Sequence, residues 1–419
     1  MSRRHPNAVT RFRAPKGTHD VLPPESRRWA RVEAAFTDLA ARFGYEPAIT
    51  PIFEATEVFV RSVGEETEVV QKQMYTFEDK GGRSLTLRPE ATASVVRAAI
   101  QAGGVSGVLK ASYWGPMFRY ERPQAGRSRQ FHQAGVEYFG EAAPEADVEV
   151  IEFGYRFLEE LEVPDVEVRL NSLGDEEDRK AYHAELVAYL QERLDLLSEE
   201  ARGRVETNPL RVLDSKADVD VVADAPIPLD HLGEEAFAHF ERVKAGLDRV
   251  GVPYVIDPHL VRGLDYYNRT VWEYVPTGYE AAQASVGGGG RYDRLFELLG
   301  GRPTPAVGLA MGVDRIILAM GERDLPRVLD LFVTYAGPPW KDEAVRLVSR
   351  LRREGLRVDI DLGDRSLKAQ FRAADRRGAR TAVVVGDEWH QGIVTAKDLV
   401  EGSQTTVPVE EIATWVLEH

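Results

Sequence analysis

The chain has 419 residues, 43% of them hydrophobic and 29% charged, so we expect a globular protein of two or three domains. It contains no cysteine, which excludes disulfides, thiolate zinc sites and a cysteine nucleophile, and its nine histidines lack metal-ligand spacing. The net charge of −15 does not exclude a nucleic-acid partner, because phosphate binding needs only a local basic patch.

The N-terminal region carries no targeting pattern. Residues 1–20 lack the apolar core of a signal peptide, and no apolar run in the chain is long enough to span a membrane. We therefore expect a cytoplasmic protein with no membrane partner. The first element is an amphipathic helix from Arg27, in which Trp29, Val32, Phe36, Leu39 and Phe43 recur at helical spacing.

Short strand-like runs dominate the region after this helix. They cover residues 49–53, 84–87, 113–120, 131–139, 270–275 and 306–310. Few of these runs have a full helix between them, so the predicted sheet is antiparallel, with helices packed on it. Neither a Rossmann nor a P-loop glycine motif follows a strand.

Two further regions differ in pattern. Residues 175–253 are mostly helical and acidic, and they interrupt the strand-rich region like an insertion. From Leu329, strands at 329–335, 357–361 and 381–385 alternate with helices at 341–354 and 366–377, which is typical of a small α/β domain. The boundary lies near residues 321–326, which gives predicted domains of 1–325 and 329–419.

The hairpin at residues 113–139 carries candidate site residues. Because side chains alternate along a strand, Gln133 and Glu137 point to the same face, and Gly135 is expected to leave a space between them. Arg119 on the opposite strand is a bidentate donor of the kind that holds a phosphate or a carboxylate. The alternative is an edge hairpin with a solvated charged face. The apolar neighbours Trp114 and Phe118 indicate burial and make this alternative less favoured.

Residues 308–315, Gly-Leu-Ala-Met-Gly-Val-Asp-Arg, are predicted to run from a strand into a helix. In that helix Val313, Ile316, Ile317 and Met320 form the core stripe, which leaves Arg315 off the stripe near the positive N-terminus. Alone, such a string marks only the start of a helix.

Together, the hairpin with Arg119 and residues 308–315 resemble the second and third signatures of class II aminoacyl-tRNA synthetases. Within this class the chain resembles the histidyl-tRNA synthetases along nearly its whole length. The matching stretches are residues 15–20 (PKGTHD), 86–90 (TLRPE), 129–133 (RQFHQ), 208–214 (NPLRVLD), 260–267 (LVRGLDYY) and 289–293 (GGRYD). Ala91 departs from the pattern, since the family usually has glycine there.

The resemblance implies an α+β catalytic domain on an antiparallel sheet with a helical insertion, and a C-terminal α/β anticodon-binding domain with a mixed sheet. It also implies activation of L-histidine by ATP to histidyl-adenylate and transfer to the 3′ end of tRNA(His). A neutral imidazole offers one donor and one acceptor, and Glu137 with the Tyr267 hydroxyl can match both; the family implies the same assignment. Glu90, Thr92 and Gln133 are acceptors suited to the α-ammonium group, and Tyr266 completes that wall.

Adenylation needs cations where charge develops on phosphorus. By resemblance, Arg119 holds the α-phosphate, Arg315 holds the γ-phosphate, and Arg262 is the catalytic cation that reaches both the carboxylate and the α-phosphate. Mg²⁺ accompanies ATP as substrate and is held mainly by ATP, and no tightly bound cofactor or structural metal is expected. A glycine run such as 287–290 is usually a loop or bulge, but its flanking residues favour a backbone lying against the adenylate, so Gly289 and Gly290 are predicted to bind ATP.

Arginines of the hairpin loop are candidates for RNA contacts. By resemblance Arg122, Arg127 and Arg129 meet the acceptor end, although Arg127 can instead touch ATP and the sequence does not decide. In the C-terminal domain a basic stripe is either an ordinary solvated face or an anticodon-stem contact. This stripe consists of Arg365, Lys368, Arg372 and Arg376. Residues 49–53 resemble the first class II signature, which implies a homodimer.

Two other functions fit parts of the pattern. The first is a synthetase-like subunit that senses histidine for ATP phosphoribosyltransferase, but such proteins typically lack the C-terminal domain and parts of LVRGLDYY, and this chain has both. The second is a synthetase-like RNA sensor fused to a kinase, and the chain contains no kinase segment.

Overall fold

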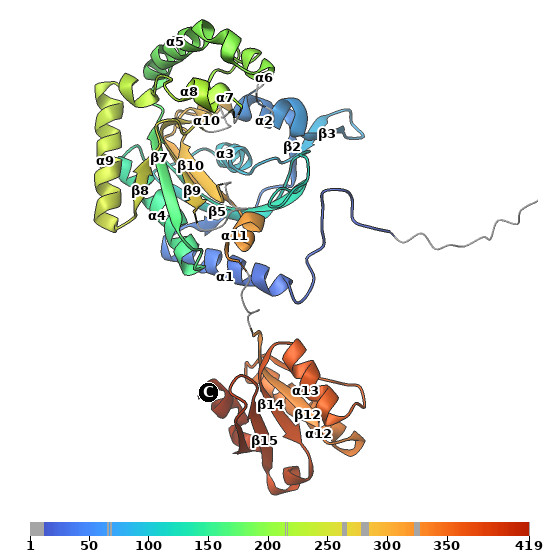
Figure 1. Ribbon diagram of the computed structural model, residues 1–419. Coiled ribbons are helices and arrows are strands. Elements are labelled where there is room, and N and C mark those ends of the chain that lie inside the picture. The colour runs from blue at the N-terminus through green and yellow to red at the C-terminus, as the bar shows by residue number, and fades with distance from the viewer. Residues whose placement is uncertain are drawn as a thin grey trace, which may run out of the picture. The chain divides into compact units, whose positions relative to one another are not determined.

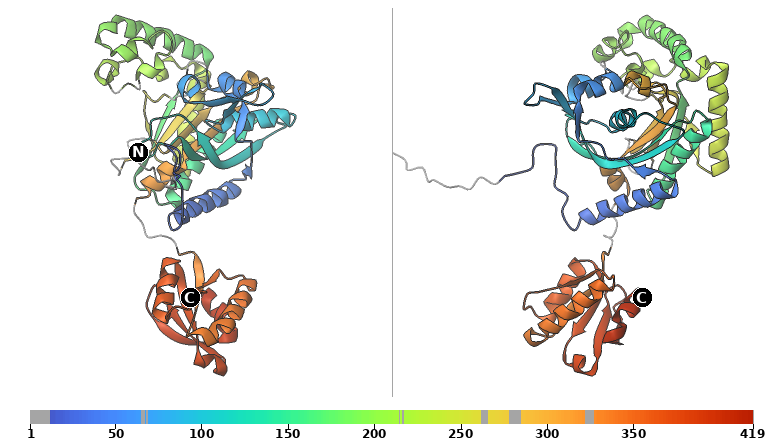
Figure 2. Two further views of the ribbon diagram at one scale, coloured as in Figure 1. Left: turned by 90° about the vertical axis from the view of Figure 1, so that its right-hand side faces the viewer. Right: turned by 180° about the vertical axis from the view of Figure 1, so that it is seen from behind.

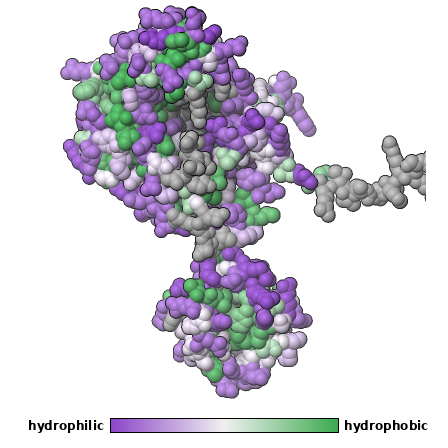
Figure 3. Space-filling view, in the orientation of Figure 1, coloured by the Kyte–Doolittle hydropathy of each residue, from purple (hydrophilic) through white to green (hydrophobic). Residues whose placement is uncertain are grey.

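The computed structural model describes residues 12–64, 67, 69–213, 215, 217–261, 266–277, 285–321 and 327–418. The chain divides into two compact units, residues 1–20 with 32–321 and residues 21–31 with 322–419. No helix within the described ranges is long and apolar enough to cross a membrane. Figure 3 shows hydrophilic side chains over much of the visible face of each unit, with apolar side chains in limited patches.

The larger unit is built on an eight-stranded sheet with the order β1-β5-β6-β11-β10-β9-β7-β8 (Figure 1). The strands are β1 (Glu46–Pro47), β5 (Leu109–Phe118), β6 (Gln130–Phe139), β7 (Val166–Ser172), β8 (Tyr254–Ile256), β9 (Asn268–Pro276), β10 (Gly287–Arg291) and β11 (Ala306–Gly312). The outer pairs β1–β5 and β7–β8 are parallel, and the inner pairs are antiparallel. The prediction of an antiparallel sheet with packed helices is confirmed.

Helices cover both faces of this sheet. α3 (Thr92–Gln101) lies inside the curve of the sheet (Figures 1 and 2), and its Val95 and Val96 share a core with Ala111 and Tyr113 of β5. α4 (Pro144–Glu160) packs on β9, where the Tyr274 hydroxyl donates to the carbonyl oxygen of Ile151 at 2.8 Å. The predicted first helix is α1 (Ser26–Arg42), which packs on α4 through contacts of Phe36 with Phe153 and Phe157.

A second sheet has three strands in the order β2-β4-β3, namely β2 (Phe53–Ala55), β4 (Ser84–Leu87) and β3 (Tyr75–Glu78). Beside it lie α2 (Thr56–Val63) and a π-helix (Val69–Gln73). The strand predicted at residues 49–53 is wrong in its start, because the strand begins at Phe53, although the Ile52 carbonyl oxygen already accepts the Arg88 backbone N–H at 2.9 Å. Pro51 has no N–H to donate to a ladder, which explains the late start.

The region after β7 is a helical insertion, as predicted. Its helices are α5 (Glu176–Glu192), α6 (Glu199–Arg202), α7 (Leu210–Leu213), α8 (Val219–Val222) and α9 (Glu234–Val250). α5 begins with a capping box between Asp175 and Asp178. α5 to α8 form a small core of their own that includes Tyr182, Leu186 and Val222, whereas α9 packs on α4.

The C-terminal unit has a five-stranded mixed sheet with the order β13-β12-β14-β15-β16. The strands are β12 (Leu329–Tyr335), β13 (Val358–Ile360), β14 (Ala379–Val385), β15 (Ile393–Asp398) and β16 (Gln404–Pro408). The helices are α12 (Lys341–Arg353), α13 (Leu367–Arg376) and α14 (Ile412–Glu418). The predicted strand–helix alternation accounts for the parallel half, and β15 and β16 add an antiparallel half.

Candidate active site

One pocket in the larger unit gathers most of the residues that were predicted to bind histidine and ATP. It contains about 970 Å³ of empty space, including the solvent at its open mouth. The predicted residues that line it are Glu90, Thr92, Arg119, Arg127, Gln133, Tyr266, Tyr267 and Arg315. They come from the start of α3, the β5–β6 hairpin, the start of β9 and α11 (Val313–Ala319), which lie far apart in the sequence. Arg262 lies outside the described residues.

Glu90 fixes the start of α3 at the pocket wall. Its two carboxylate oxygens accept the backbone N–H groups of Thr92 at 2.7 Å and Ala93 at 2.9 Å. Burial raises the pKa of Glu90, while these two donors oppose the shift. Ala91 has φ −106° and ψ −24°, so its backbone does not need glycine and its methyl group lies in the buried core.

Glu137 lies beneath the pocket wall and is completely buried. One carboxylate oxygen accepts the Thr92 hydroxyl at 2.6 Å, and the other accepts the Tyr292 hydroxyl. Burial raises the pKa of Glu137 to about 8, although these two hydrogen bonds favour the charged form. Gly308 of β11 pairs with Glu137, and a Cβ at Gly308 would collide with its carboxylate. The carboxyl group is therefore in contact with Thr92, Tyr292 and Gly308, which line the pocket.

The space expected above Gly135 is filled, so that prediction is wrong. A Cβ at Gly135 would collide with the Tyr113 hydroxyl, because Tyr113 of β5 lies directly across from it. Gln133 faces the pocket beside this tyrosine. Its buried side-chain oxygen has no hydrogen-bond partner among the described residues, which leaves one acceptor directed at a ligand.

Three buried tyrosines, Tyr266, Tyr267 and Tyr292, form a cluster at the pocket wall. Ring centroids are 4.7 Å apart for Tyr266 and Tyr267, 5.4 Å for Tyr266 and Tyr292, and 6.3 Å for Tyr267 and Tyr292. Tyr292 was missed by the sequence reasoning, which treated GGRYD only as a family pattern. Its position in that pattern, next to a charged residue in a short strand, was the available signal.

The glycine run forms strand β10 and not a loop. Gly287 lines the pocket, whereas Gly289 and Gly290 pack inside the sheet. A Cβ at Gly290 would come within 2.6 Å of the Tyr267 ring, and one at Gly289 would come within 2.7 Å of the Trp272 ring. The β9–β10 pairing changes register between Gly290 and Arg291, so the bulge named as one alternative is present.

Three arginines, Arg119, Arg127 and Arg315, also line the pocket. The Nε of Arg119 donates to the Pro89 carbonyl oxygen at 2.9 Å, and its guanidinium lies 5.4 Å from the centre of the Phe131 ring. Arg119 directly follows β5 and is not inside it as predicted. Arg315 donates to the carbonyl oxygens of Gly126 at 3.0 Å and Ser285 at 2.8 Å.

These cations are close enough to affect one another. Burial lowers the pKa of Arg315, and repulsion from Arg127 and Arg119 adds to the shift. Besides Glu90, the carboxylates of Glu121, Glu273 and Asp314 also line the pocket. An arrangement of three cations in one cleft suits a ligand with several negative charges.

Comparisons with known proteins agree with this geometry. The family model described as histidyl-tRNA synthetase matches residues 17–316, and that of an anticodon binding domain matches residues 330–419. The chain belongs to the histidyl-tRNA synthetase family.

Individual relatives match it over nearly their full length. A histidine--tRNA ligase of Geobacillus thermodenitrificans is 46% identical, over 97% of this chain and 98% of the relative. One of Geobacillus kaustophilus is 47% identical over the same shares. The crystal structure of apo S. aureus histidyl-tRNA synthetase has a TM-score of 0.77 at 36% identity and covers 97% of this chain and 100% of that chain.

Two other predicted arginines, Arg122 and Arg129 of the hairpin loop, do not line the pocket. Arg122 is exposed in the hairpin loop, and the Arg129 guanidinium lies 3.8 Å from the centre of the Tyr120 ring. On α13, Lys368, Arg372 and Arg376 are exposed, as a basic stripe requires. Placing Arg365 on that helix was wrong, because it precedes Ser366, the residue that caps α13, and pairs with Asp361 at 3.6 Å.

Proposed function

We propose that this chain activates L-histidine with ATP to histidyl-adenylate and transfers the histidyl group to the 3′ end of tRNA(His). One observation carries the proposal: the cluster of Tyr266, Tyr267 and Tyr292 shares a pocket with Arg119, Arg127 and Arg315, and the Tyr292 hydroxyl donates to the buried Glu137. This supports a polar site for a small side chain beside a cationic site for phosphates. In the first step a carboxylate oxygen of histidine attacks the α-phosphorus of ATP, and pyrophosphate leaves.

The histidine side of the site follows from hydrogen-bond matching. Glu137 is proposed to accept the imidazole N–H, and the Tyr267 hydroxyl to donate to the other ring nitrogen. Tyr292 holds the Glu137 carboxyl group in place. The unpartnered oxygen of Gln133, together with Glu90 and Thr92, suits the α-ammonium group, and Tyr266 closes the wall.

The phosphate side follows from charge. Arg119 is proposed to hold the α-phosphate and Arg315 the γ-phosphate, with Mg²⁺ arriving on ATP as part of the substrate. Arg262 keeps its proposed catalytic role, the stabilisation of charge between the carboxylate and the α-phosphate. We assign the backbone next to the adenylate to Gly287, while Gly289 and Gly290 act by giving room to Trp272 and Tyr267.

The reaction is tested by exchange of labelled pyrophosphate into ATP with each of the twenty amino acids. Exchange is expected with histidine only, and it should be lost in Arg262→Ala, with thermal unfolding as the control for folding. A wild-type protein that binds histidine without exchange would favour the alternative, a histidine-sensing regulatory subunit of ATP phosphoribosyltransferase.

RNA binding is proposed to use both units. We propose that residues 1–325 form the catalytic domain, where the loop residues Arg122 and Arg129 meet the acceptor end of the tRNA. Residues 329–419 are proposed to bind the anticodon stem through Lys368, Arg372 and Arg376, with Arg365 beside them. These substrates belong to protein synthesis, so we propose that the enzyme acts in the cytoplasm.

A homodimer is proposed from an apolar surface near the second sheet. Ile49 is 96% exposed, Ile52 44%, Phe53 51% and Phe77 44%, and the rings of Phe53 and Phe77 lie 6.5 Å apart. An apolar surface of this kind is costly to leave in water, and a second copy of the chain can cover it. Light scattering at micromolar protein should give twice the chain mass of 46.8 kDa, and the mass of one chain would contradict the proposal.

A further inference from the structure

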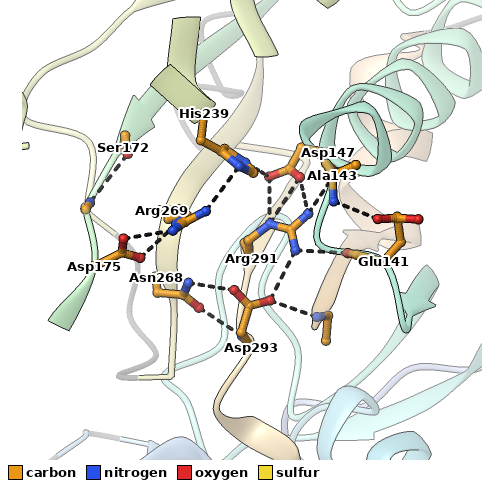
Figure 4. Close-up of polar contacts among 12 residues, drawn as sticks. Glu141, Ala143, Asp147, Ser172, Asp175, His239, Asn268, Arg269, Arg291 and Asp293 are labelled. Carbon is orange, nitrogen blue, oxygen red and sulfur yellow. Dashed lines mark hydrogen bonds and ion pairs between the residues drawn. The ribbon is translucent and has the colours of Figure 1, made fainter. Parts of the chain in front are cut away.

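Two residues that lie outside the pocket each follow one of the three tyrosines in the chain and bind to each other. Asn268 directly follows Tyr267, and Asp293 directly follows Tyr292. The Asn268 amide donates to an Asp293 carboxylate oxygen at 3.0 Å, and the Asp293 backbone N–H donates to the Asn268 side-chain oxygen at 2.8 Å. We call this pair of hydrogen bonds the Asn268–Asp293 clip (Figure 4).

The clip lies where the backbone pairing of β9 and β10 is interrupted. Gly290 pairs with Val271, but Arg291 pairs with Asn268, so Arg269 and Thr270 have no opposite residue on β10. Arg269 has a φ of 50°, which is unfavourable for a residue with a side chain. It is held by Asp175 through hydrogen bonds of 2.7 and 2.9 Å. The ladder is therefore irregular beside Tyr267 and Tyr292, where the pair of Asn268 and Arg291 stands apart from the regular pairs that end at Val271 and Gly290.

Buried contacts anchor the Asp293 side of the clip. Its second carboxylate oxygen accepts the backbone N–H of Ala306 in β11 at 2.9 Å and the Arg291 guanidinium at 3.1 Å. Arg291 is 1% exposed, and it pairs with Asp147 of α4 and donates to the carbonyl oxygen of Glu141 at 3.1 Å (Figure 4). These contacts hold Asp293 against β11 and, through Arg291, against α4. The clip then holds Asn268, the residue after Tyr267, against Asp293.

We propose that the Asn268–Asp293 clip is a positioning device that sets the spacing between Tyr267 and Tyr292 and so the geometry in which Glu137 meets the histidine side chain. The inference rests on the proposed histidine site. Asn268 and Asp293 do not line the pocket, so they act through the tyrosines and not on the substrate. Tyr292 transmits the position directly, because its hydroxyl donates to Glu137.

A reciprocal exchange of the two side chains isolates the clip from charge and volume. In Asp293→Asn two amides meet, and no orientation of them satisfies the Asn268 side chain, the backbone N–H of residue 293, Ala306 and Arg291 together. The double variant Asn268→Asp/Asp293→Asn reverses donor and acceptor and restores both bonds of the clip. It also moves the negative charge away from Arg291, so a defect due to lost charge would persist.

Steady-state pyrophosphate exchange tests the proposal. Loss of one buried hydrogen bond should raise KM for histidine by about tenfold in Asp293→Asn, with KM for ATP nearly unchanged and most of the loss recovered in the double variant. Asn268→Ala, which removes the clip without opposing two donors, should show the same selective rise, and thermal unfolding confirms that each variant is folded.

Three results would overturn the clip: unchanged KM for histidine, parallel rises in KM for histidine and ATP, or a double variant as defective as Asp293→Asn. The proposed function is tested separately, by the histidine-dependent exchange activity of the wild type. A wild type without histidine-dependent exchange overturns the proposed function and the clip together, whereas an active wild type with any of the three results overturns the clip alone.

Discussion

Arg119→Ala is expected to lower kcat for histidine-dependent pyrophosphate exchange by about a thousandfold, because a preorganised cation at the α-phosphate acts mainly in the transition state. The structure supplies the preorganisation. Its Nε is held by the Pro89 carbonyl oxygen at 2.9 Å, and its guanidinium lies against Phe131. A charge already fixed in this way costs no reorganisation when the reaction begins. Steady-state exchange with saturating histidine and ATP gives kcat directly.

Two matched variants define the specificity of this effect. Arg119→Lys keeps the charge but loses the planar fork, so it should recover only part of the rate. Arg122→Ala removes an exposed arginine three residues away and should leave exchange unchanged. Equal losses in Arg119→Ala and Arg122→Ala, or a change in KM alone, would contradict the assigned role.

Glu137→Gln is expected to raise KM for histidine by about a hundredfold, since a buried site built to hydrogen-bond its substrate loses much affinity when one partner is replaced. The amide cannot accept from Thr92, Tyr292 and the imidazole as the carboxylate can. KM for ATP should change little, because the substitution leaves the three pocket arginines, which are proposed to bind the phosphates, in place. A similar rise for both substrates would contradict a histidine-specific role.

The pH dependence of the unfolding free energy, compared between the wild type and Glu137→Gln, tests the pKa of the buried carboxyl group. Burial raises the pKa of Glu137 from its ordinary 4.5 to about 8, so the folded protein holds a proton that the unfolded chain releases. The stability due to this proton is complete below pH 4.5 and is lost as pH rises toward 8. Without ligand, the wild type should therefore lose unfolding free energy relative to Glu137→Gln between pH 5 and 8. Parallel stability curves would show that the carboxyl group titrates normally.

Periodicity predicted the fold well where one strand or helix determines the pattern. The alternation in residues 131–139 identified β6 and the shared face of Gln133 and Glu137, and the apolar stripe of residues 313–320 identified α11. The wrong predictions concern side chains on adjacent strands, which the periodicity of a single strand does not identify. Tyr113 fills the space over Gly135 because it lies opposite Gly135 in the pairing of β5 with β6. The register of that pairing cannot be predicted from the sequence pattern alone.

The partners of Glu137 illustrate the same limit at the site. The imidazole argument placed Tyr267 across the ligand from Glu137, which stays a prediction, and it did not identify Thr92 and Tyr292 as the hydroxyl donors to Glu137. Tyr292 reaches Glu137 only because β10 and β6 both border β11, which brings together residues 155 positions apart. Such a contact follows from the order of the strands in the sheet and not from a local sequence pattern. The strand order depends on how all the strands of the sheet pack together, so periodicity within one strand does not predict it.

Attachment of histidine to RNA is tested by incubating the protein with tRNA(His), ATP, Mg²⁺ and labelled histidine and following the label that precipitates with the RNA. Base-labile histidine is expected on the RNA. No label is expected on RNA whose 3′ end was oxidised with periodate beforehand, or with the other amino acids. A protein that exchanges pyrophosphate with histidine but leaves the RNA unlabelled, or that labels it with another amino acid, would show that it is not a histidine--tRNA ligase.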